Sequence, residues 1–383
     1  MRSAPPSWGA QAWRDGPHSP LAGLAGSNAH GSGFLAAAQQ LARERGVASG
    51  LLPGLEMISC TSGAIASTAS YLRGEDLRAD LQRRIDDAEQ ARRRWWLTTQ
   101  ETPQQAAAAT VLFGVPGVFR GLLYALPRHY WRTALEFLRE GIGWRRAPTV
   151  EDLTDLLLPA RVLVPDLSDA FFTATVETLA GAPVGVVFNS YAPTRDVEYL
   201  HVNDRGLELI REYHDPAASY DGGGPVQYRP ISRAGLREAL WLFYYGLRGD
   251  AAVDGAYARS IIVDELTFAQ QIWAVRPLNS EWLGPLPSNL PEVLDLQTEL
   301  WMNASYREQV RAIRLIGRLG DAGRAELSKD DDKHRDYHPV DLQEVELQRQ
   351  RGFWTYFVED LDVFDAARVL AHTRLREQYP PQP

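Results

Sequence analysis

The sequence is short of cysteine, lysine and net positive charge, and each shortage excludes something. Its single cysteine, Cys60, forbids a disulfide within the chain and leaves the redox compartment open. The formal net charge of −9 argues against a protein whose main function is to bind nucleic acid. Of the 40 basic residues only Lys329 and Lys333 are lysine and the other 38 are arginine, a bias that indicates a GC-rich bacterial genome rather than a function.

A clear targeting signal is also missing. The first twenty residues are rich in Pro, Gly and Trp and lack the basic start and apolar run of a secretory signal. Residues 106–126 are almost uncharged, but Gly114, Pro116 and Arg120 interrupt them, whereas a membrane-spanning helix needs about 20 mainly apolar residues. This segment predicts a buried or lid-forming pair of helices, with membrane contact as the alternative. We therefore expect a cytoplasmic protein, with peripheral membrane contact as the alternative.

What the sequence does contain is the composition of a folded globular protein. Its 383 residues are 45% hydrophobic and 23% charged, which excludes wholesale disorder and collagen-like repeats. The length suits one large α/β domain with insertions, or two domains. We find no internal repeat, and we expect an irregular arm over residues 1–19, a domain over 20–320, and a charged linker with a helical extension over 321–383.

Strand–turn–helix units follow one another at the start of this domain. A short apolar strand and a helix flank the turn 26–31, and a second strand and helix flank the turn 60–64. This alternation of strands and helices is typical of a parallel α/β sheet. We expect strands over 21–26, 55–59, 183–189, 197–202 and 266–276; helices over 33–45, 65–72, 231–247, 290–318 and 340–378; a mainly helical region over 74–158; and a loop over 213–230.

Ser62 stands where a catalytic serine is expected. A serine between a strand and a helix, flanked by small residues, forms a nucleophile elbow, usually written Gly-x-Ser-x-Gly. Here residues 60–64 read Cys-Thr-Ser-Gly-Ala, so Gly63 follows the serine and small residues replace both outer glycines. An ordinary Ser/Gly turn is the alternative interpretation. The turn 26–31 lies far enough upstream for one helix and one strand, which predicts that both turns lie side by side, with backbone N–H groups facing a developing oxyanion.

These two turns resemble those of the patatin-like phospholipase family. That family has a Gly-Gly-Gly-x-Arg-Gly oxyanion turn, then Gly-x-Ser-x-Gly, and far downstream a catalytic aspartate in Asp-Gly-Gly or Asp-Gly-Ala. The resemblance covers roughly residues 20–75 and 180–300. It implies a three-layer α/β/α sandwich with a mainly parallel central sheet, here with a helical insertion over about 76–160 and a helical C-terminal extension.

The resemblance also implies a Ser–Asp dyad that needs no histidine relay, metal or cofactor, with Ser62 as the nucleophile. Gly26, Ser27 and Asn28 stand at the oxyanion turn, where Ser27 and Asn28 replace two of the family's glycines. His30 stands in place of the family's arginine, or it is simply a polar turn residue.

Two aspartates compete for the second place in the dyad. Asp221, followed by two glycines, is the literal motif, but it lies in an expected loop. Asp254, in Asp-Gly-Ala, lies between the helix over 231–247 and the strand over 266–276, the context that the family shows. We favour Asp254 and expect Asp221 to cap its own turn.

The sequence thus predicts a serine acyl hydrolase that acts on a lipid or another acyl ester through an acyl-enzyme. An acyltransferase on the same fold is one alternative, and a binding protein that has lost catalysis is another, because every motif departs from the family pattern. Cys60 is expected to pack in the core rather than to react. The run 333–338 holds two histidines without the helical spacing of a metal-binding pair, so we expect no metal there.

Overall fold

The computed structural model describes most of the sheet-forming part of the chain. The described residues are 17–21, 29–86, 168–213, 226–243, 251–276, 281–283, 286–288, 290–321, 340–346 and 361–380. The strands are β1 (Pro17–Leu21), β2 (Met57–Cys60), β3 (Gly185–Ala192), β4 (Val197–Val202), β5 (Val226–Pro230), β6 (Val253–Asp254), β7 (Gln271–Arg276) and β8 (Asp341–Glu346). The helices are α1 (Ala29–Glu44), α2 (Ala64–Leu72), α7 (Asp169–Ala180), α8 (Asp204–Tyr213), α9 (Arg233–Ala239), α10 (Leu290–Asp321) and α11 (Leu361–Gln378), with short 3-10 helices η2 (Gly255–Tyr257) and η3 (Asp264–Leu266).

The eight strands form one sheet in the order β5-β4-β3-β2-β1-β7-β8, and β6 pairs with β3 beside this path. Neighbouring strands run parallel except at β3–β4 and β3–β6, which are antiparallel. Parallel strands bring their carboxyl ends to one edge of the sheet, where the turns that follow them gather. The expected mainly parallel sheet is confirmed.

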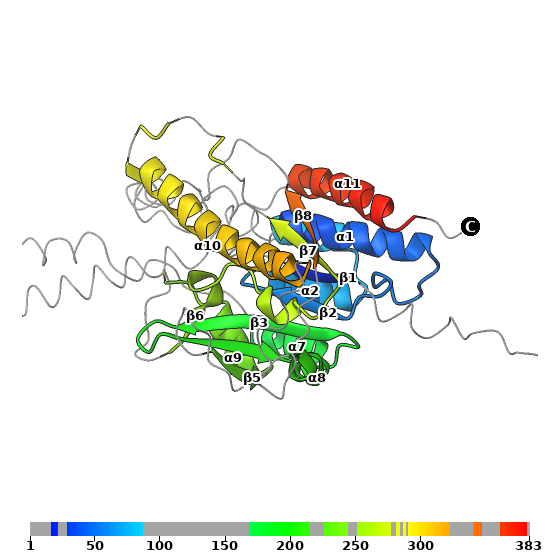
Figure 1. Ribbon diagram of the computed structural model, residues 1–383, viewed down its shortest axis with the longest axis horizontal. Helices are drawn as coiled ribbons and strands as arrows, with labels where there is room; N and C mark the ends of the chain where they lie inside the picture. The colour runs from blue at the N-terminus through cyan, green and yellow to red at the C-terminus, as the bar shows by residue number, and fades with distance from the viewer. Residues whose placement is uncertain are drawn as a thin grey trace, which may run out of the picture.

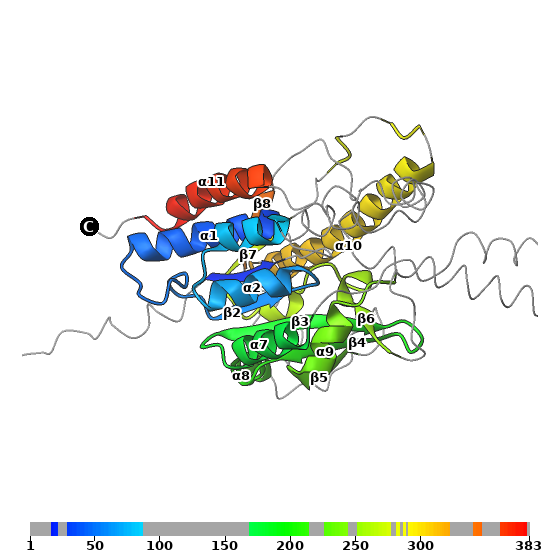
Figure 2. The same ribbon diagram turned by 180° about the vertical axis from the view of Figure 1, so that it is seen from behind.

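Helices cover both faces of the sheet, which makes three layers. Alternate residues of each strand point to opposite faces. Ile58 and Cys60 of β2 pack into a core with α1, α2, α7, α9 and α11, whereas Met57 packs into a second core with α8 and α10. Helix α10 crosses the front of the molecule in Figure 1, and α2, α7 and α9 lie in front when it is seen from behind in Figure 2.

The end of the chain takes part in this sheet. Strand β8 pairs in parallel with β7 along six residues, and α11 lies beside α1 (Figure 1). The two helices approach so closely that a Cβ added to Gly33 would lie 2.5 Å from the Phe364 carbonyl oxygen. Residues expected as a helical extension therefore contribute both a strand and a covering helix.

Several element boundaries differ from the predictions. Strand β1 lies over 17–21 instead of 21–26, although Pro17 and Pro20 cannot donate to a ladder, because β2 and β7 pair with it on both sides. Strand β5 lies within the expected loop, and β8 within the expected helix over 340–378; in both, pairing with a neighbour overrides local preference. Helix α1 begins at Ala29, four residues early, and α9 ends at Ala239, eight residues early.

The apolar segment 106–126 lies outside the described residues, as does most of the expected helical insertion. Residues 77–86, at its start, are helical. Across the part of the chain that the structure describes, no helix combines the length and apolar character needed to cross a membrane.

Candidate active site

Ser62 lies in a strained turn between a strand and a helix. Strand β2 ends at Cys60, and α2 begins at Ala64. The backbone φ of Ser62 is 56°, in the left-handed region that side chains other than glycine rarely adopt, and only Asp196 shares this property among the described non-glycine residues. Such a conformation costs about 1–3 kcal/mol and persists only where the surroundings impose it. The local backbone is that of a nucleophile elbow.

The turn is packed from all sides. Ser62, Cys60 and Ala64 are each buried, so larger residues beside the serine would have no room. The Ser62 hydroxyl completes no hydrogen bond of ordinary length and angle within the described residues. The hydroxyl is nevertheless close enough to the Asp254 carboxyl to stabilise the charged carboxylate, which lowers the pKa of Asp254. The hydroxyl and the carboxyl therefore face each other without a fully formed hydrogen bond.

The sheet explains how Asp254 reaches the serine. Strand β3 pairs with β4 along one edge, and along its other edge it pairs first with β2 and then with β6. Cys60 lies opposite Phe188 and Asp254 lies opposite Ser190, two residues further along β3. Strand β6 thus takes the place of β2 where β2 turns away into Ser62. Because residues directly opposite share a face, Asp254 points to the face that α2 covers.

The Asp254 carboxyl is buried and has an unusual affinity for its proton. Burial raises its pKa from the ordinary 3.8 to about 7, while the Ser62 hydroxyl and the Ala256 N–H, 2.9 Å from Oδ1, lower it. The backbone N–H of Asp254 also donates to the Trp241 carbonyl at 2.9 Å. Asp254 is therefore held rigidly and can exchange a proton near neutral pH.

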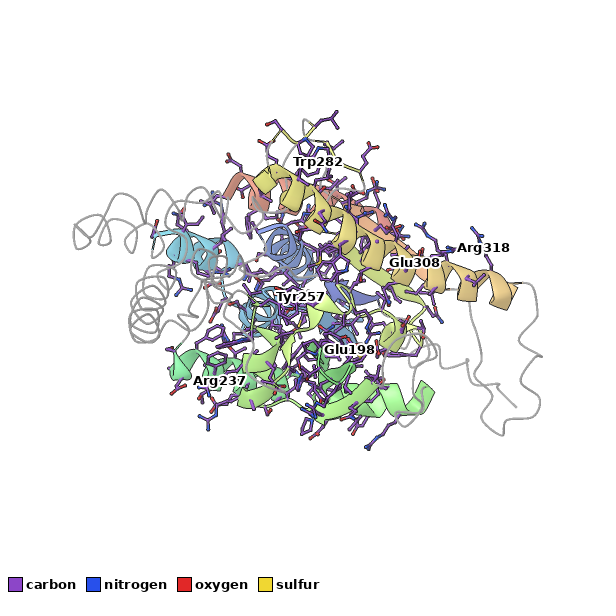
Figure 3. The ribbon with its side chains drawn as sticks, turned by 90° about the vertical axis from the view of Figure 1, so that its left-hand side faces the viewer. Glu198, Arg237, Tyr257, Trp282, Glu308 and Arg318 are labelled. Atoms are coloured by element: carbon purple, nitrogen blue, oxygen red, sulfur yellow. The ribbon has the colours of Figure 1, made fainter. Side chains whose placement is uncertain are left out.

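Aromatic side chains lie next to the turn that carries Asp254. The Tyr257 ring, labelled in Figure 3, lies 4.0 Å from the Phe243 ring and 5.9 Å from that of Trp301 on α10, measured between centroids. Trp301 is partly exposed, as are Val293 and Leu300 on the same helix. An apolar surface therefore lies next to this turn.

The other predicted site residues fall into two groups. Gly63 is the N-cap of α2, and His30 lies buried in the first turn of α1 rather than in a turn, with Nε2 3.2 Å from the Val345 carbonyl oxygen of β8. This contact directs His30 toward the edge strand. Gly26, Ser27, Asn28 and Asp221 lie outside the described residues, so their roles stay predictions.

Cys60 is buried, and burial raises the pKa of its thiol to about 12, an effect that the Thr68 hydroxyl partly opposes. At neutral pH the side chain is a thiol rather than a reactive thiolate. The described residues contain no group of three or more His, Cys, Asp and Glu side chains that could hold a metal ion. Residues 333–338 lie outside them.

The polar residues of β3 beside the candidate site were not predicted from the sequence. Ser190, opposite Asp254, has its Oγ 2.9 Å from Nε2 of His201, and burial lowers the pKa of this histidine to about 4. Asn189 lies on the other face and binds the turn after Asp254. The available signal was an Asn-Ser pair in a strand that otherwise reads as continuously apolar.

Comparisons with known proteins find only a distant structural likeness. No protein-family model matches the chain, and no curated protein matches its sequence. One solved structure it resembles is human GIVD cytosolic phospholipase A2 in complex with a methyl γ-linolenyl fluorophosphonate inhibitor. The match has a TM-score of 0.28 and 16% sequence identity, and it covers 76% of this chain and 44% of the phospholipase chain.

Proposed function

We propose that the protein is a serine acyl hydrolase of the patatin-like type, with Ser62 as nucleophile and Asp254 as general base. One observation carries the proposal: a buried serine in a strained strand-to-helix turn faces a buried aspartate whose pKa is about 7. A general base works best with a pKa near the operating pH. The incomplete hydrogen bond between the two groups agrees with catalytic hydrogen bonds that tighten only when substrate binds.

The proposed reaction runs in two halves. Ser62 Oγ attacks the ester carbonyl while its proton passes to the Asp254 carboxylate, and the carbonyl electrons move onto the oxygen. When the tetrahedral intermediate collapses, the ester C–O bond breaks and the leaving alcohol takes the proton from Asp254. Water then attacks the acyl-enzyme, with Asp254 again as the base, and releases the acid and Ser62.

The developing oxyanion needs donors. Helix α2 starts directly after Ser62, so its N-terminal end lies beside the reacting oxygen and favours negative charge there. The Gly63 N–H is the donor expected from an elbow. The turn at Gly26, Ser27 and Asn28 would supply others, as the family resemblance implies. Loss of one such donor typically costs about 3 kcal/mol of transition-state stabilisation.

The aromatic surface around Tyr257 and the exposed apolar side chains of α10 support an apolar acyl chain as part of the substrate. A lipid ester would bring the protein to a membrane surface from the cytoplasm, and this location is part of the proposal. Binding to phosphatidylcholine vesicles, measured by flotation, tests it, and failure to bind would favour a soluble ester.

The direct test is labelling of the full chain with a fluorophosphonate probe, followed by peptide mass spectrometry. We expect modification at Ser62 and none in Ser62→Ala, with hydrolysis of p-nitrophenyl esters by the wild type alone. An unlabelled but folded wild type would favour the binding protein that has lost catalysis. Product analysis with and without an added alcohol acceptor separates hydrolysis from acyl transfer.

A further inference from the structure

The turn that follows Asp254 is anchored on the face of β3 opposite to the carboxyl. The Gly255 carbonyl accepts hydrogen bonds from the N–H groups of Ala258 and Arg259, at 3.0 and 2.9 Å. Asn189 Nδ2 lies 3.2 Å from this same oxygen and 3.1 Å from the Arg259 carbonyl oxygen. One buried amide therefore holds both ends of the turn.

The fit between Asn189 and the turn is tight. Asn189 precedes Ser190, which lies opposite Asp254, so its side chain lies over Gly255. A Cβ added to Gly255 would lie 2.1 Å from Asn189 Cγ, well inside any real contact. Gly255 is thus required by the asparagine next to it, and the two residues work as a pair.

A charged cluster fixes Asn189 and the far end of the turn. The Arg259 guanidinium binds both oxygens of Glu265, at 3.0 and 3.1 Å, and Glu198 at 3.1 and 3.2 Å, and lies 3.4 Å from Asp264. Glu198, labelled in Figure 3, also accepts from Asn189 Nδ2 at 2.8 Å. Side-chain rotamers held by such bonds stay in one position.

We propose that Asn189 is a positioning residue for Asp254: through the Gly255 carbonyl it fixes the turn so that the Ala256 N–H and the Ser62 hydroxyl both meet the carboxyl. This inference rests on the proposed function and deepens it. Asn189 touches no reacting atom. Its loss should loosen the Ala256 N–H contact, which stabilises the carboxylate, and so make Asp254 harder to ionise.

The groups around Asp254 allow a change in its pKa to be assigned to the turn. On its own face lie Ser190 and His201, with Glu238 of α9 and Arg229 of β5 beyond them. On the opposite face lie Glu198, Arg259, Asp264 and Glu265. Burial, the Ser62 hydroxyl and the Ala256 N–H are the causes of the shift in the pKa of Asp254, and the last two depend on the position of the turn. A shift in its titration therefore reports on the turn.

The test compares Asn189→Ala with a matched variant, Asn203→Ala. Asn203 is also buried, and its amide bonds the Val186 N–H and the Val184 carbonyl at the amino end of β3, away from Ser62. Both variants lose several buried hydrogen bonds and should lower the melting temperature. The rate of Ser62 labelling by the fluorophosphonate is measured from pH 5 to 9. For Asn189→Ala we expect at least a tenfold slower plateau, and an acid limb moved upward by about one pH unit.

Asn203→Ala should keep the wild-type acid limb and plateau. Asn189→Asp keeps the side-chain size and, while its carboxyl is protonated, one donor, so its rate should lie between those of the wild type and Asn189→Ala. It also decides the question if the alanine variant does not fold. A wild-type acid limb in either Asn189 variant, once folded, would overturn the inference and leave Asn189 a purely structural residue.

A second measurement needs no reactivity at Ser62. Ionisation of Asp254 makes the free energy of unfolding depend on pH, and Asn189→Ala should move the midpoint of that dependence upward by the same amount. If the wild type is not labelled, the proposed function fails, and this midpoint still tests the link between Asn189 and Asp254.

Discussion

The two faces of β3 at its carboxyl end carry buried carboxyl groups in opposite circumstances. On one face Asp254 forms no ion pair with a cation among the described residues, and burial raises its pKa to about 7. On the other face Glu265, equally buried, is bound through both oxygens by Arg259. A paired carboxylate holds structure, whereas one left without a cation can exchange a proton.

The most severe way to break this contrast is to remove the unpaired carboxyl. Asp254→Asn keeps an acceptor for the Ala256 N–H but cannot take the serine proton. We expect kcat/KM for p-nitrophenyl esters to fall by a factor of about 1000 or more, or 4 kcal/mol. Asp221→Asn serves as the control and should cost less than about tenfold. The reverse ranking would show that the literal motif, rather than the sheet context, identifies the base.

Removing the cation from the opposite face should damage folding instead. Arg259→Met leaves the buried Glu198 and Glu265 and the partly buried Asp264 without this cation, which should cost about 3–5 kcal/mol of unfolding free energy in urea titrations. Arg78→Met, which breaks an exposed pair with Asp365, should change stability little. Equal effects of the two substitutions would mean that the buried cluster contributes no more than a surface pair.

The contrast also predicts that removing the Asp254 carboxyl raises the free energy of unfolding, whereas removing the Arg259 guanidinium lowers it. Asp254 holds its proton with a pKa of about 7 when folded and 3.8 when unfolded, so the free energy of unfolding falls as pH rises from about 4 to 7. Above pH 7 the penalty is complete. Asp254→Asn should therefore be more stable than the wild type by about 4 kcal/mol at pH 8 and by little at pH 4. Urea titrations at the two pH values measure it, and an unstabilised variant at pH 8 would refute the raised pKa.

The smallest effect concerns the strained serine. Ser62→Gly should stabilise the fold by about 1 kcal/mol or less, because glycine adopts a positive φ without steric cost. Ser62→Ala keeps the Cβ and should show no such gain. Both variants should be inactive, so a rise in melting temperature for the glycine variant alone isolates the strain. Equal melting temperatures would argue against it.

The strand, turn and helix around Ser62 were predictable because their signals are local. A short apolar run followed by small residues indicated β2, its turn and α2 to within a residue or two. The start of α9 was predictable in the same way: Ser232 directly precedes the helix and accepts from the Gly235 N–H at 3.1 Å, which is what an N-cap serine does. Local sequence determined both, and distant contacts did not change them.

What escaped prediction depends on long-range pairing. Strand β6 has two residues and no pattern of its own, and it exists because β3 offers an edge beyond the end of β2. Strand β8 carries alternating polar residues that suit a helix equally well, and β7 decides the matter. Asn189 was named only as the end of a strand, because its partners Gly255 and Arg259 lie about 70 residues away.

The packing of α11 on α1 has a consequence for synthesis. The first of these helices ends at Glu44 and the second begins at Leu361, so 316 residues separate them in sequence. At a translation rate of about 5–20 residues per second, α1 waits roughly 15–60 seconds after it is made before its covering helix exists. During that interval the apolar face of α1, where Gly33 makes the closest contact with α11, is open to chaperones. Strand β8 can likewise pair with β7 only when nearly the whole described chain has been made.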